Sequence, residues 1–178
     1  MNSSKKSPAP KAPAPHKPQP GSGKAVQESQ VFMTEMVLPN HTNRLGNLLG
    51  GQLMHWIDIC AAIAAFRHTN RVCVTASVDE LNFLHPIKEG EVVMLHGSIN
   101  RAFRTSVEVG VKVTAENLLT GESKHANTAY LTFVAIDEEG RPVPVPPIVP
   151  RTSDEKRRYE DAAERRDRRL EHRRAKNG

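Results

Sequence analysis

The order of the expected elements restricts the fold of this chain more than any other feature. A β-like run begins at Gln30 and ends at Pro39-Asn40, and a glycine turn then leads into one long apolar helix that ends near Thr69-Asn70. Four strand-like runs follow the helix, at residues 72–83, 92–100, 106–115 and 123–136. Because helices and strands do not alternate, we expect an α+β fold, with a single long helix packed on an antiparallel sheet of about five to six strands.

The run at residues 106–115 predicts how the sheet is covered. Its four valines alternate with polar or small residues, a period of two that is typical of a strand with one buried face and one solvated face. We therefore expect the helix to cover one face of the sheet and water to cover the other.

The two ends of the chain differ from the domain between them, which we expect at residues 30–140. Residues 1–29 are rich in Pro, Ala and Lys, so a disordered tail is expected there. Prolines predict an extended connector at residues 141–151 that takes no part in a sheet. Residues 152–178 combine a capping-box pattern with acid–base pairs at helical spacing, which predicts a mostly solvated, charged helix that frays at its end. The side chains with which this helix could dock are Tyr159, Ala162, Ala163 and Leu170.

The distribution of charge argues against a nucleic-acid-binding protein. The chain has a net charge of +5, but residues 31–150 hold nine basic and twelve acidic residues, so the excess of positive charge belongs to the two ends. A nucleic-acid-binding domain would carry that excess on its folded surface. Binding of nucleic acid is therefore not expected.

The two cysteines and the absence of long apolar runs indicate where in the cell the protein is expected. Cys60 lies within the apolar helix and Cys73 at the start of a strand, where both read as small buried residues rather than as a disulfide. No run is apolar for long enough to cross a bilayer, and the N-terminus lacks the apolar core of a secretory signal. We expect a soluble, cytoplasmic protein without a membrane partner.

Asp58 is the residue that most strongly suggests a chemical task. On a helix it shares a face with small or apolar residues, which are Met54, Ala61, Ala62 and Ala65. A carboxylate in such surroundings must face a cleft or be desolvated, and such a group usually has a partner, a raised pKa or a catalytic role. The alternative is that Asp58 lies on the exposed stripe of an amphipathic helix.

The pair Gly50-Gly51 precedes Asp58 at the start of the same helix. A helix N-terminus presents unpaired N–H groups, and without side chains there it can hold an anion or polarise a carbonyl, although glycines at such a turn can also be purely structural. Asp58 is two turns further on, roughly 10 Å along the axis at the usual rise per residue. One chain's Asp58 is therefore badly placed for a carbonyl at its own Gly51, and a neighbouring copy would have to supply the glycine turn.

Other motifs are weaker. Arg101, Arg104, Thr105 and Ser106 form a cluster at a strand junction that suits a phosphate group, although an ordinary solvated turn is the alternative. The histidines have no spacing typical of a zinc site, and no nucleophile elbow, phosphate-binding loop or dinucleotide fingerprint is present. We expect neither a metal nor a cofactor.

Four segments together resemble the hotdog-fold acyl-coenzyme A thioesterases, in the branch of bacterial YciA and the animal brain-type acyl-CoA hydrolases. They are residues 43–65, 81–86, 101–106 and 132–137. The resemblance covers about residues 30–145 and excludes both tails. It implies a long helix wrapped by an antiparallel sheet, dimers that join their sheets edge to edge, and further assembly into trimers of dimers, with active sites at the dimer interface.

The resemblance also implies roles for individual residues. Asp58 matches the general base or nucleophile, Asn43 the asparagine that positions the thioester or the water, and Gly51, next to Gly50, the residue whose N–H faces the thioester oxygen. The implied activity is hydrolysis of acyl-CoA thioesters, in which Asp58 activates water or attacks the carbonyl to give a mixed anhydride.

The remaining implied roles concern substrate binding. The cluster at residues 101–106 falls where coenzyme A phosphates are held, and Asn82 and Phe83 lie in a strand that borders the acyl tunnel in relatives. No metal or redox cofactor is implied. Two alternatives are a hotdog protein that hydrates acyl thioesters and an acyl-CoA-binding sensor.

Overall fold

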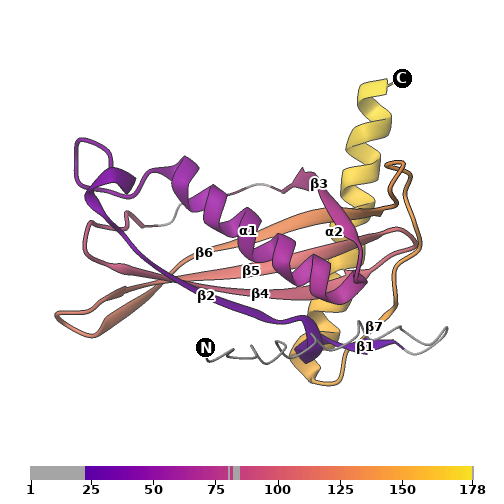
Figure 1. Ribbon diagram of the computed structural model, residues 1–178, viewed down its shortest axis with the longest axis horizontal. Helices are drawn as coiled ribbons and strands as arrows, with labels where there is room; N and C mark the ends of the chain where they lie inside the picture. Colours follow the sequence, from indigo (N-terminus) through magenta and orange to yellow (C-terminus); the bar gives the residue numbers. More distant parts are fainter. Residues whose placement is uncertain (1–22, 80, 82–84, 178) are drawn as a thin grey trace, which may run out of the picture.

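A five-stranded antiparallel sheet forms the centre of the computed structural model, which describes residues 23–79, 81 and 85–177 (Figure 1). Its strands are β2 (Val31–Met36), β3 (Val72–Val78), β4 (Val92–Ala102), β5 (Ser106–Asn117) and β6 (Glu122–Ile136). The order across the sheet is β2-β4-β5-β6-β3, so β2 and β3 are the edge strands. Helix α1 (Gly50–Thr69) lies across one face of the sheet, which confirms the expected α+β architecture.

Small residues allow α1 to lie close to the sheet. A Cβ atom added at Gly97 of β4 would lie 3.0 Å from Sγ of Cys60, so the helix contacts the strand backbone directly. The helix ends where expected, because Asn70 adopts a left-handed conformation (φ 53°) and donates its N–H to the carbonyl of Phe66. Cys60 and Cys73 are buried free thiols, as expected, and burial raises the pKa of Cys60 to about 11.

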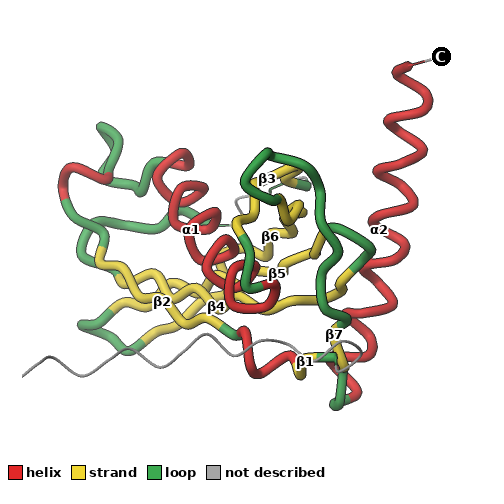
Figure 2. Tube along the Cα trace, turned by 45° about the vertical axis from the view of Figure 1, so that its right-hand side comes forward, coloured by secondary structure: helices red, strands yellow, loops and turns green. Residues whose placement is uncertain are grey.

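The second helix, α2 (Ser153–Asn177), covers the opposite face of the sheet, and Figure 2 shows the strands between α1 and α2. The valines of β5 at 107, 109, 111 and 113 are fully buried against the α1 side. The expectation that water covers the other face is wrong at Glu108 and Gly110, which are also buried, because α2 lies over them. Most of α2 is nevertheless exposed, as expected. Of its expected docking side chains, Ala162 is fully buried, Tyr159 and Ala163 are half-buried, and Leu170 is exposed.

Two short segments that flank the domain in the sequence pair in a small parallel ladder. Strand β1 (Lys24–Ala25) pairs with β7 (Ile148–Val149), with the 3-10 turn η1 (Val26–Ser29) following β1. Residues 24–29 are therefore ordered rather than part of a tail, and the proline-rich connector does take part in a sheet, because its run of two non-proline residues can donate N–H groups. The tail expected at residues 1–22 lies outside the described residues. A second turn, η2 (Pro39–His41), leads toward α1.

Candidate active site

Asp58 lies midway along α1 and lines a cavity of about 240 Å³ between α1 and β3, which we call the helix cavity. The side chain is half-buried. The residues that line the helix cavity are Gly51, Met54, His55, Ile57, Asp58, Val78, Leu81 and Leu131. Most of these are apolar, so the carboxylate faces an apolar cleft rather than a fully solvated helix stripe.

Thr75 of β3 holds this carboxylate, and the sequence analysis did not identify it. Its Oγ1 donates a hydrogen bond of 2.9 Å to Oδ1 of Asp58. The register between β3 and β6 shifts between Thr75 and Ser77, a bulge that changes the direction of the edge strand next to the helix cavity. A threonine in a strand is ordinary, so only the three-dimensional pairing of β3 with α1 reveals this role.

The N-terminus of α1 opens into the same cavity. No described side chain caps this end, where Leu49 is the N-cap. The N–H groups of Gln52 and Leu53 both donate to the carbonyl of Leu49. Within the described part of the chain, the N–H groups of Gly50 and Gly51 have no acceptor. A Cβ atom at Gly51 would meet no described atom within 4 Å, so packing against the described part of the chain does not require a glycine here. The site is open to the approach of another molecule.

Gly51 and Asp58 of one chain both line the helix cavity, despite their separation of two helical turns. A backbone donor and a carboxylate therefore face one space within a single subunit. That a neighbouring copy supplies the glycine turn stays a prediction.

Asn43 lies on the exposed loop before α1 and does not line the helix cavity of its own chain. Its side-chain Oδ1 accepts hydrogen bonds from the N–H groups of Leu45 and Asn47, at 2.9 and 3.3 Å. This arrangement is an Asx turn, which fixes the side chain and leaves the amide NH₂ as its outward-facing donor. The structure of one chain does not bring Asn43 to Asp58.

The cluster at residues 101–106 is not gathered into one phosphate-binding site. The Arg101 guanidinium lies over the Tyr159 ring at 4.0 Å, and its Nη1 donates to the Tyr159 carbonyl of α2 at 3.0 Å. Arg104 is exposed, and the backbone carbonyl of Thr105 accepts from Ala135. Only Ser106 among the four expected residues lines a second, larger cavity.

This second cavity, which we call the α2 groove, has a volume of about 960 Å³ and lies between the sheet and the C-terminal half of α2. Its sheet wall comes from β3, β5 and β6 and from Phe103. The sheet-side lining residues are Ala76, Ser77, Val78, Asp79, Phe103, Ser106, Tyr130, Thr132 and Val134. The α2 wall is strongly basic, with Arg165, Arg166, Arg168, Arg169, Leu170, His172, Arg173 and Lys176.

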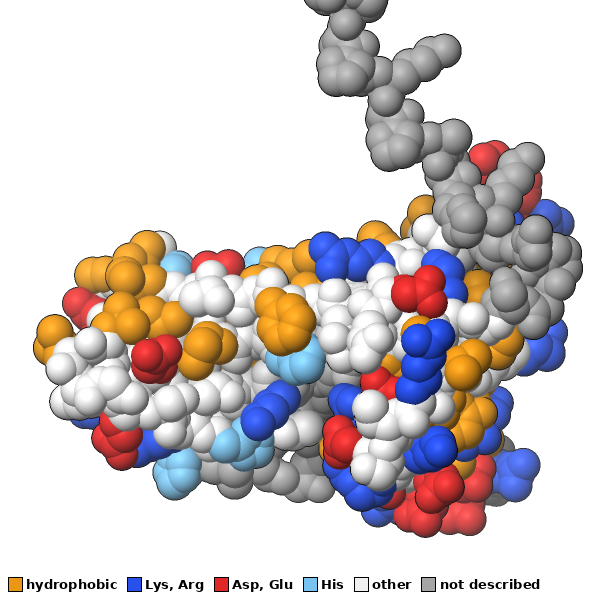
Figure 3. All heavy atoms as spheres, turned by 90° about the horizontal axis from the view of Figure 1, so that it is seen from below, with side chains coloured by type: hydrophobic (Ala, Val, Ile, Leu, Met, Phe, Trp, Pro, Cys, Tyr) orange, Lys and Arg blue, Asp and Glu red, His pale blue; other side chains and the backbone are white. Residues whose placement is uncertain are grey.

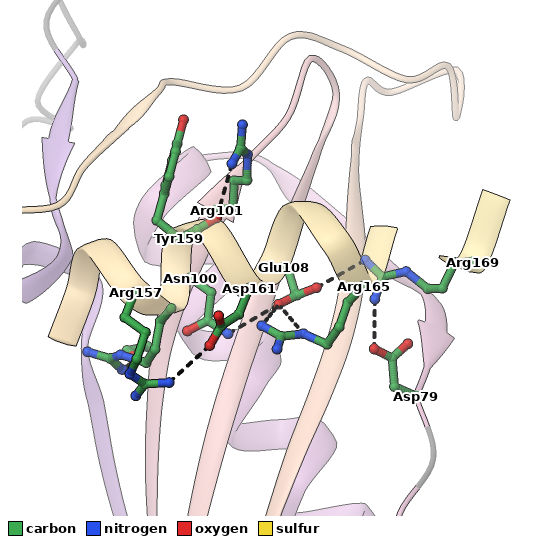
Figure 4. A network of polar contacts seen from close by, with 11 residues as sticks. Asp79, Asn100, Arg101, Glu108, Arg157, Tyr159, Asp161, Arg165 and Arg169 are labelled. Carbon is green, nitrogen blue, oxygen red and sulfur yellow. Dashed lines mark hydrogen bonds and ion pairs between the residues drawn. The ribbon is translucent and has the colours of Figure 1, made fainter. Parts of the chain in front are cut away.

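A buried ionic network fixes α2 above the sheet, as Figure 4 shows. Glu108 of β5 is fully buried and accepts from Nη2 of Arg165 at 2.7 Å and from Nη2 of Arg169 at 3.0 Å. Nη1 of Arg169 also reaches Asp79, at 2.7 Å, and Asn100 donates to Glu108 at 3.2 Å. A buried carboxylate with two guanidinium partners is compensated in charge and in hydrogen bonds. The signals in the sequence were a lone glutamate among valines and two arginines four residues apart.

The remaining expectations concern Asn82, Phe83, metal binding and membrane spans. Asn82 and Phe83 lie outside the described residues, although their neighbour Leu81 lines the helix cavity. Among the described residues, no group of His, Cys, Asp or Glu side chains is arranged to hold a metal ion. In the same part of the chain, neither helix combines the length and apolar character that a membrane span requires.

The family model and two of the similar proteins found for this chain are described as thioesterases or thioester hydrolases. A family model described as the thioesterase superfamily matches residues 45–122. An uncharacterized acyl-CoA thioester hydrolase of Bacillus subtilis, YkhA, is 45% identical over 78% of this chain and 81% of its own length. Mouse acyl-coenzyme A thioesterase 11 is 43% identical over 80% of this chain, which corresponds to 24% of the mouse protein.

Solved structures of the same kind superpose closely. An acyl-CoA hydrolase from Staphylococcus aureus, in complex with butyryl coenzyme A, coenzyme A and coenzyme A disulfide, has a TM-score of 0.81 at 36% identity, over 86% of this chain and 94% of that one. Alanine variants of an aspartate, a threonine and an asparagine of that enzyme have also been solved. An apo-hexameric acyl-CoA thioesterase has a TM-score of 0.81 at 41% identity, over 84% of this chain and 97% of that one.

Proposed function

The chain belongs to the thioesterase superfamily, among the hotdog-fold acyl-CoA hydrolases, and from this premise we propose that it hydrolyses acyl-CoA thioesters to a free acid and coenzyme A. The observation that carries the proposal is the Asp58 carboxylate, which lines an apolar cavity, is held by Thr75, and shares that cavity with the uncapped turn at Gly51. A carboxylate, a hydroxyl that orients it, and a backbone N–H are the groups that acyl transfer to water requires.

Two routes use the same groups. In one, Asp58 takes a proton from water, the hydroxide adds to the thioester carbon, the C–S bond breaks, and the coenzyme A thiolate is protonated. In the other, the carboxylate attacks the carbon directly, releases the thiolate and forms a mixed anhydride that water then cleaves. In both routes, the N–H of Gly51 would stabilise negative charge on the carbonyl oxygen. Neither route needs a resident metal or redox cofactor.

The Staphylococcus aureus variants support these roles. The asparagine, aspartate and threonine replaced in that enzyme follow one another with the same spacing along the chain as Asn43, Asp58 and Thr75 do here. The comparison therefore supports Asn43 as a member of the site, although it lies away from Asp58 within one chain. It also supports Thr75, which the sequence analysis did not propose.

We further propose that the site is shared between two subunits that meet along β3. Among the described residues, this edge strand has no partner on its outer side, and its apolar side chains Val72, Val74 and Val78 are 61%, 44% and 41% exposed. Exposed apolar side chains on an unpaired strand favour pairing with another chain. The hexameric relative supports a trimer of such dimers. The buried, unpaired thiols of Cys60 and Cys73 support a reducing compartment, for which we propose the cytoplasm.

The test is thiol release from acyl-CoAs of increasing chain length by the wild type and by Asp58→Asn. We expect the variant to fold normally and to lose turnover by about 10²- to 10⁴-fold, the usual contribution of a positioned base. Asp167→Asn, at an exposed site on α2, is the matched control and should retain full activity. Free thiol as the product distinguishes hydrolysis from hydration of the acyl chain. Near-normal turnover in Asp58→Asn would contradict the proposal.

A further inference from the structure

The α2 groove has an excess of positive charge that the protein itself does not balance. Six cations line it, and two of them, Arg165 and Arg169, pair with Glu108 and Asp79. Within the described residues, the other four have no carboxylate partner, and they are Arg166, Arg168, Arg173 and Lys176. Cations that line one groove and have no carboxylate partner among the described residues favour a ligand with several negative charges.

The opposite wall of the groove offers different chemistry. Phe103 presents its ring beneath Arg166, whose guanidinium lies 4.3 Å from the ring centroid, and Tyr130 presents its ring beneath Arg165. Ser106 adds a hydroxyl, and the buried Oγ1 of Thr132 has no hydrogen-bond partner within the described residues. A groove with cations on one side and aromatic rings and hydroxyls on the other fits a phosphorylated group with a planar, polar body.

The groove also adjoins the candidate active site. Val78, at the end of β3, lines both the α2 groove and the helix cavity, so the two spaces lie on either side of this edge strand. Of the two arginines expected to hold phosphates, Arg101 is occupied by Tyr159, and Arg104 is exposed and does not line the groove. The cations that line the groove come instead from α2.

From these observations we propose that the α2 groove binds the phosphorylated adenosine end of the acyl-CoA substrate, with Arg168 and Arg173 as its principal phosphate ligands. The inference rests on the proposed function, and it gives α2 a role in substrate binding. Extended nucleic acid is disfavoured, because exposed acids on the same helix, Glu160, Glu164, Asp167 and Glu171, would repel it. On the face shown in Figure 3, Lys and Arg side chains are likewise interspersed with Asp and Glu rather than gathered into one basic field.

The experiment compares two substrates in the full-length protein: butyryl-CoA, and S-butyryl pantetheine, which lacks all the phosphates and the adenosine. The variant is the double change Arg168→Glu with Arg173→Glu, and Arg174→Glu, beside the groove but not in its lining, is the control. We expect the KM for butyryl-CoA to rise about tenfold or more in the double variant, because each charged hydrogen bond to phosphate is lost. Kinetics on S-butyryl pantetheine and those of the control should not change.

Different results would contradict binding in the α2 groove and hydrolysis of acyl-CoA. An unchanged KM for butyryl-CoA in the double variant, or an equal loss on both substrates, overturns the groove assignment while hydrolysis stands. If the wild type cleaves neither thioester, the proposed function fails, and calorimetric titration with coenzyme A and dephospho-coenzyme A still tests the groove. Binding that the double variant does not weaken then overturns the inference. Arg168→Ala with Arg173→Ala repeats the comparison if the charge reversal prevents folding.

Discussion

Thr75 on the edge strand β3 donates a hydrogen bond of 2.9 Å to Oδ1 of Asp58 on the central helix. Within the described residues, this is the one hydrogen bond to that carboxylate. It fixes the orientation of the acid and leaves Oδ2 available to a water molecule or a thioester carbon. The bond joins α1 to β3, and both elements border the helix cavity. A substitution in β3 is therefore expected to change the orientation and reactivity of Asp58 on α1.

Replacing Thr75 by valine keeps the shape of the side chain and removes the donor. We expect kcat to fall by about 10- to 100-fold, as for the loss of one hydrogen bond to a charged group, with a smaller change in KM. Thr75→Ser keeps the hydroxyl and should recover most of the activity. Steady-state kinetics and a thermal melt of each variant test this. Equal activity in the valine and serine variants would show that the hydroxyl does not act on Asp58.

Gly51 in the first turn of α1 and Gly97 in the neighbouring strand β4 should respond differently to replacement by alanine. At Gly51 a Cβ atom meets no described atom within 4 Å, so Gly51→Ala should leave the free energy of unfolding unchanged or raise it by up to about 1 kcal/mol. Turnover should nevertheless fall, because the methyl group enters the space through which the thioester approaches. At Gly97 the Cβ atom would lie 3.0 Å from Sγ of Cys60, and Gly97→Ala should cost about 1–3 kcal/mol.

Urea denaturation and thiol-release assays on both alanine variants give the comparison. A Gly51→Ala enzyme with full activity and wild-type stability would show that no substrate group approaches this backbone. A stable Gly97→Ala variant would show that α1 can move away from β4.

Glu108 should be essential for the docking of α2. Glu108→Gln removes the charge partner of Arg165 and leaves Arg169 paired with Asp79, and we expect a loss of about 3–5 kcal/mol. Glu164→Gln, at an exposed position of α2, should change stability by less than about 0.5 kcal/mol. Chemical denaturation measures both, and amide exchange in α2 should increase only in the first variant. Unchanged protection of α2 would contradict the proposed anchor.

The parts of the fold that depend on hydropathy could be predicted from the sequence. The valines of β5 at 107, 109, 111 and 113 predict a strand with one apolar face, and the apolar run from Gly50 predicts a helix that covers such a face. The left-handed Asn70 ends the helix where the apolar pattern ends. Each of these features is local, so no knowledge of distant contacts was needed.

The docking of α2 could be predicted only in part. The buried Ala162 and the half-buried Tyr159 were among its expected contacts, but arginines also join the helix to the sheet. A hydropathy pattern cannot distinguish an arginine that pairs with a buried carboxylate from one that water surrounds. Glu108 contacts Arg165 and Arg169 only because the connector after β6 leads the chain back across the sheet, where α2 packs over β5. For the same reason Thr75 was missed and Arg101 was expected to be free, since both depend on which elements lie together.

The capping box at the start of α2 gives the helix a pH-dependent anchor. Glu155 accepts hydrogen bonds from the N–H groups of Arg151 and Thr152, at 2.6 and 3.0 Å. Burial raises the pKa of this carboxyl group, but the two N–H groups and the charge of Arg158 outweigh it, so the pKa lies below its ordinary value of 4.5. Because the folded pKa is depressed, this stabilisation is fully present above pH 4.5 and is lost as the pH falls through the folded pKa.

Glu155→Gln tests this dependence. At pH 7 the variant should be about 1 kcal/mol less stable than the wild type, the usual value of a helix cap. As the pH falls below 4.5 and through the depressed folded pKa, the difference should shrink, because the carboxyl group is protonated first in the unfolded and then in the folded state. Denaturation curves at a series of pH values measure it. A difference that stays constant down to the lowest pH at which the protein folds would show that the charge of Glu155 does not contribute.

The sharing of one site between two subunits can be tested by complementation. Asp58→Asn removes the acid, and Gly51→Pro removes the backbone donor at a first-turn position where proline is tolerated. Each variant alone should be inactive.

If the acid of one subunit acts with the turn of the other, a heterodimer has one intact site and one doubly altered site. An equal mixture that exchanges subunits freely should then recover about a quarter of wild-type activity, since half of the dimers are mixed. If Asp58 acts with Gly51 of its own chain, every site in the mixture carries one lesion, and no activity returns. Recovery at the expected level places the acid and the donor on different chains, and its absence in demonstrably mixed oligomers assigns the reaction to the helix cavity of a single chain.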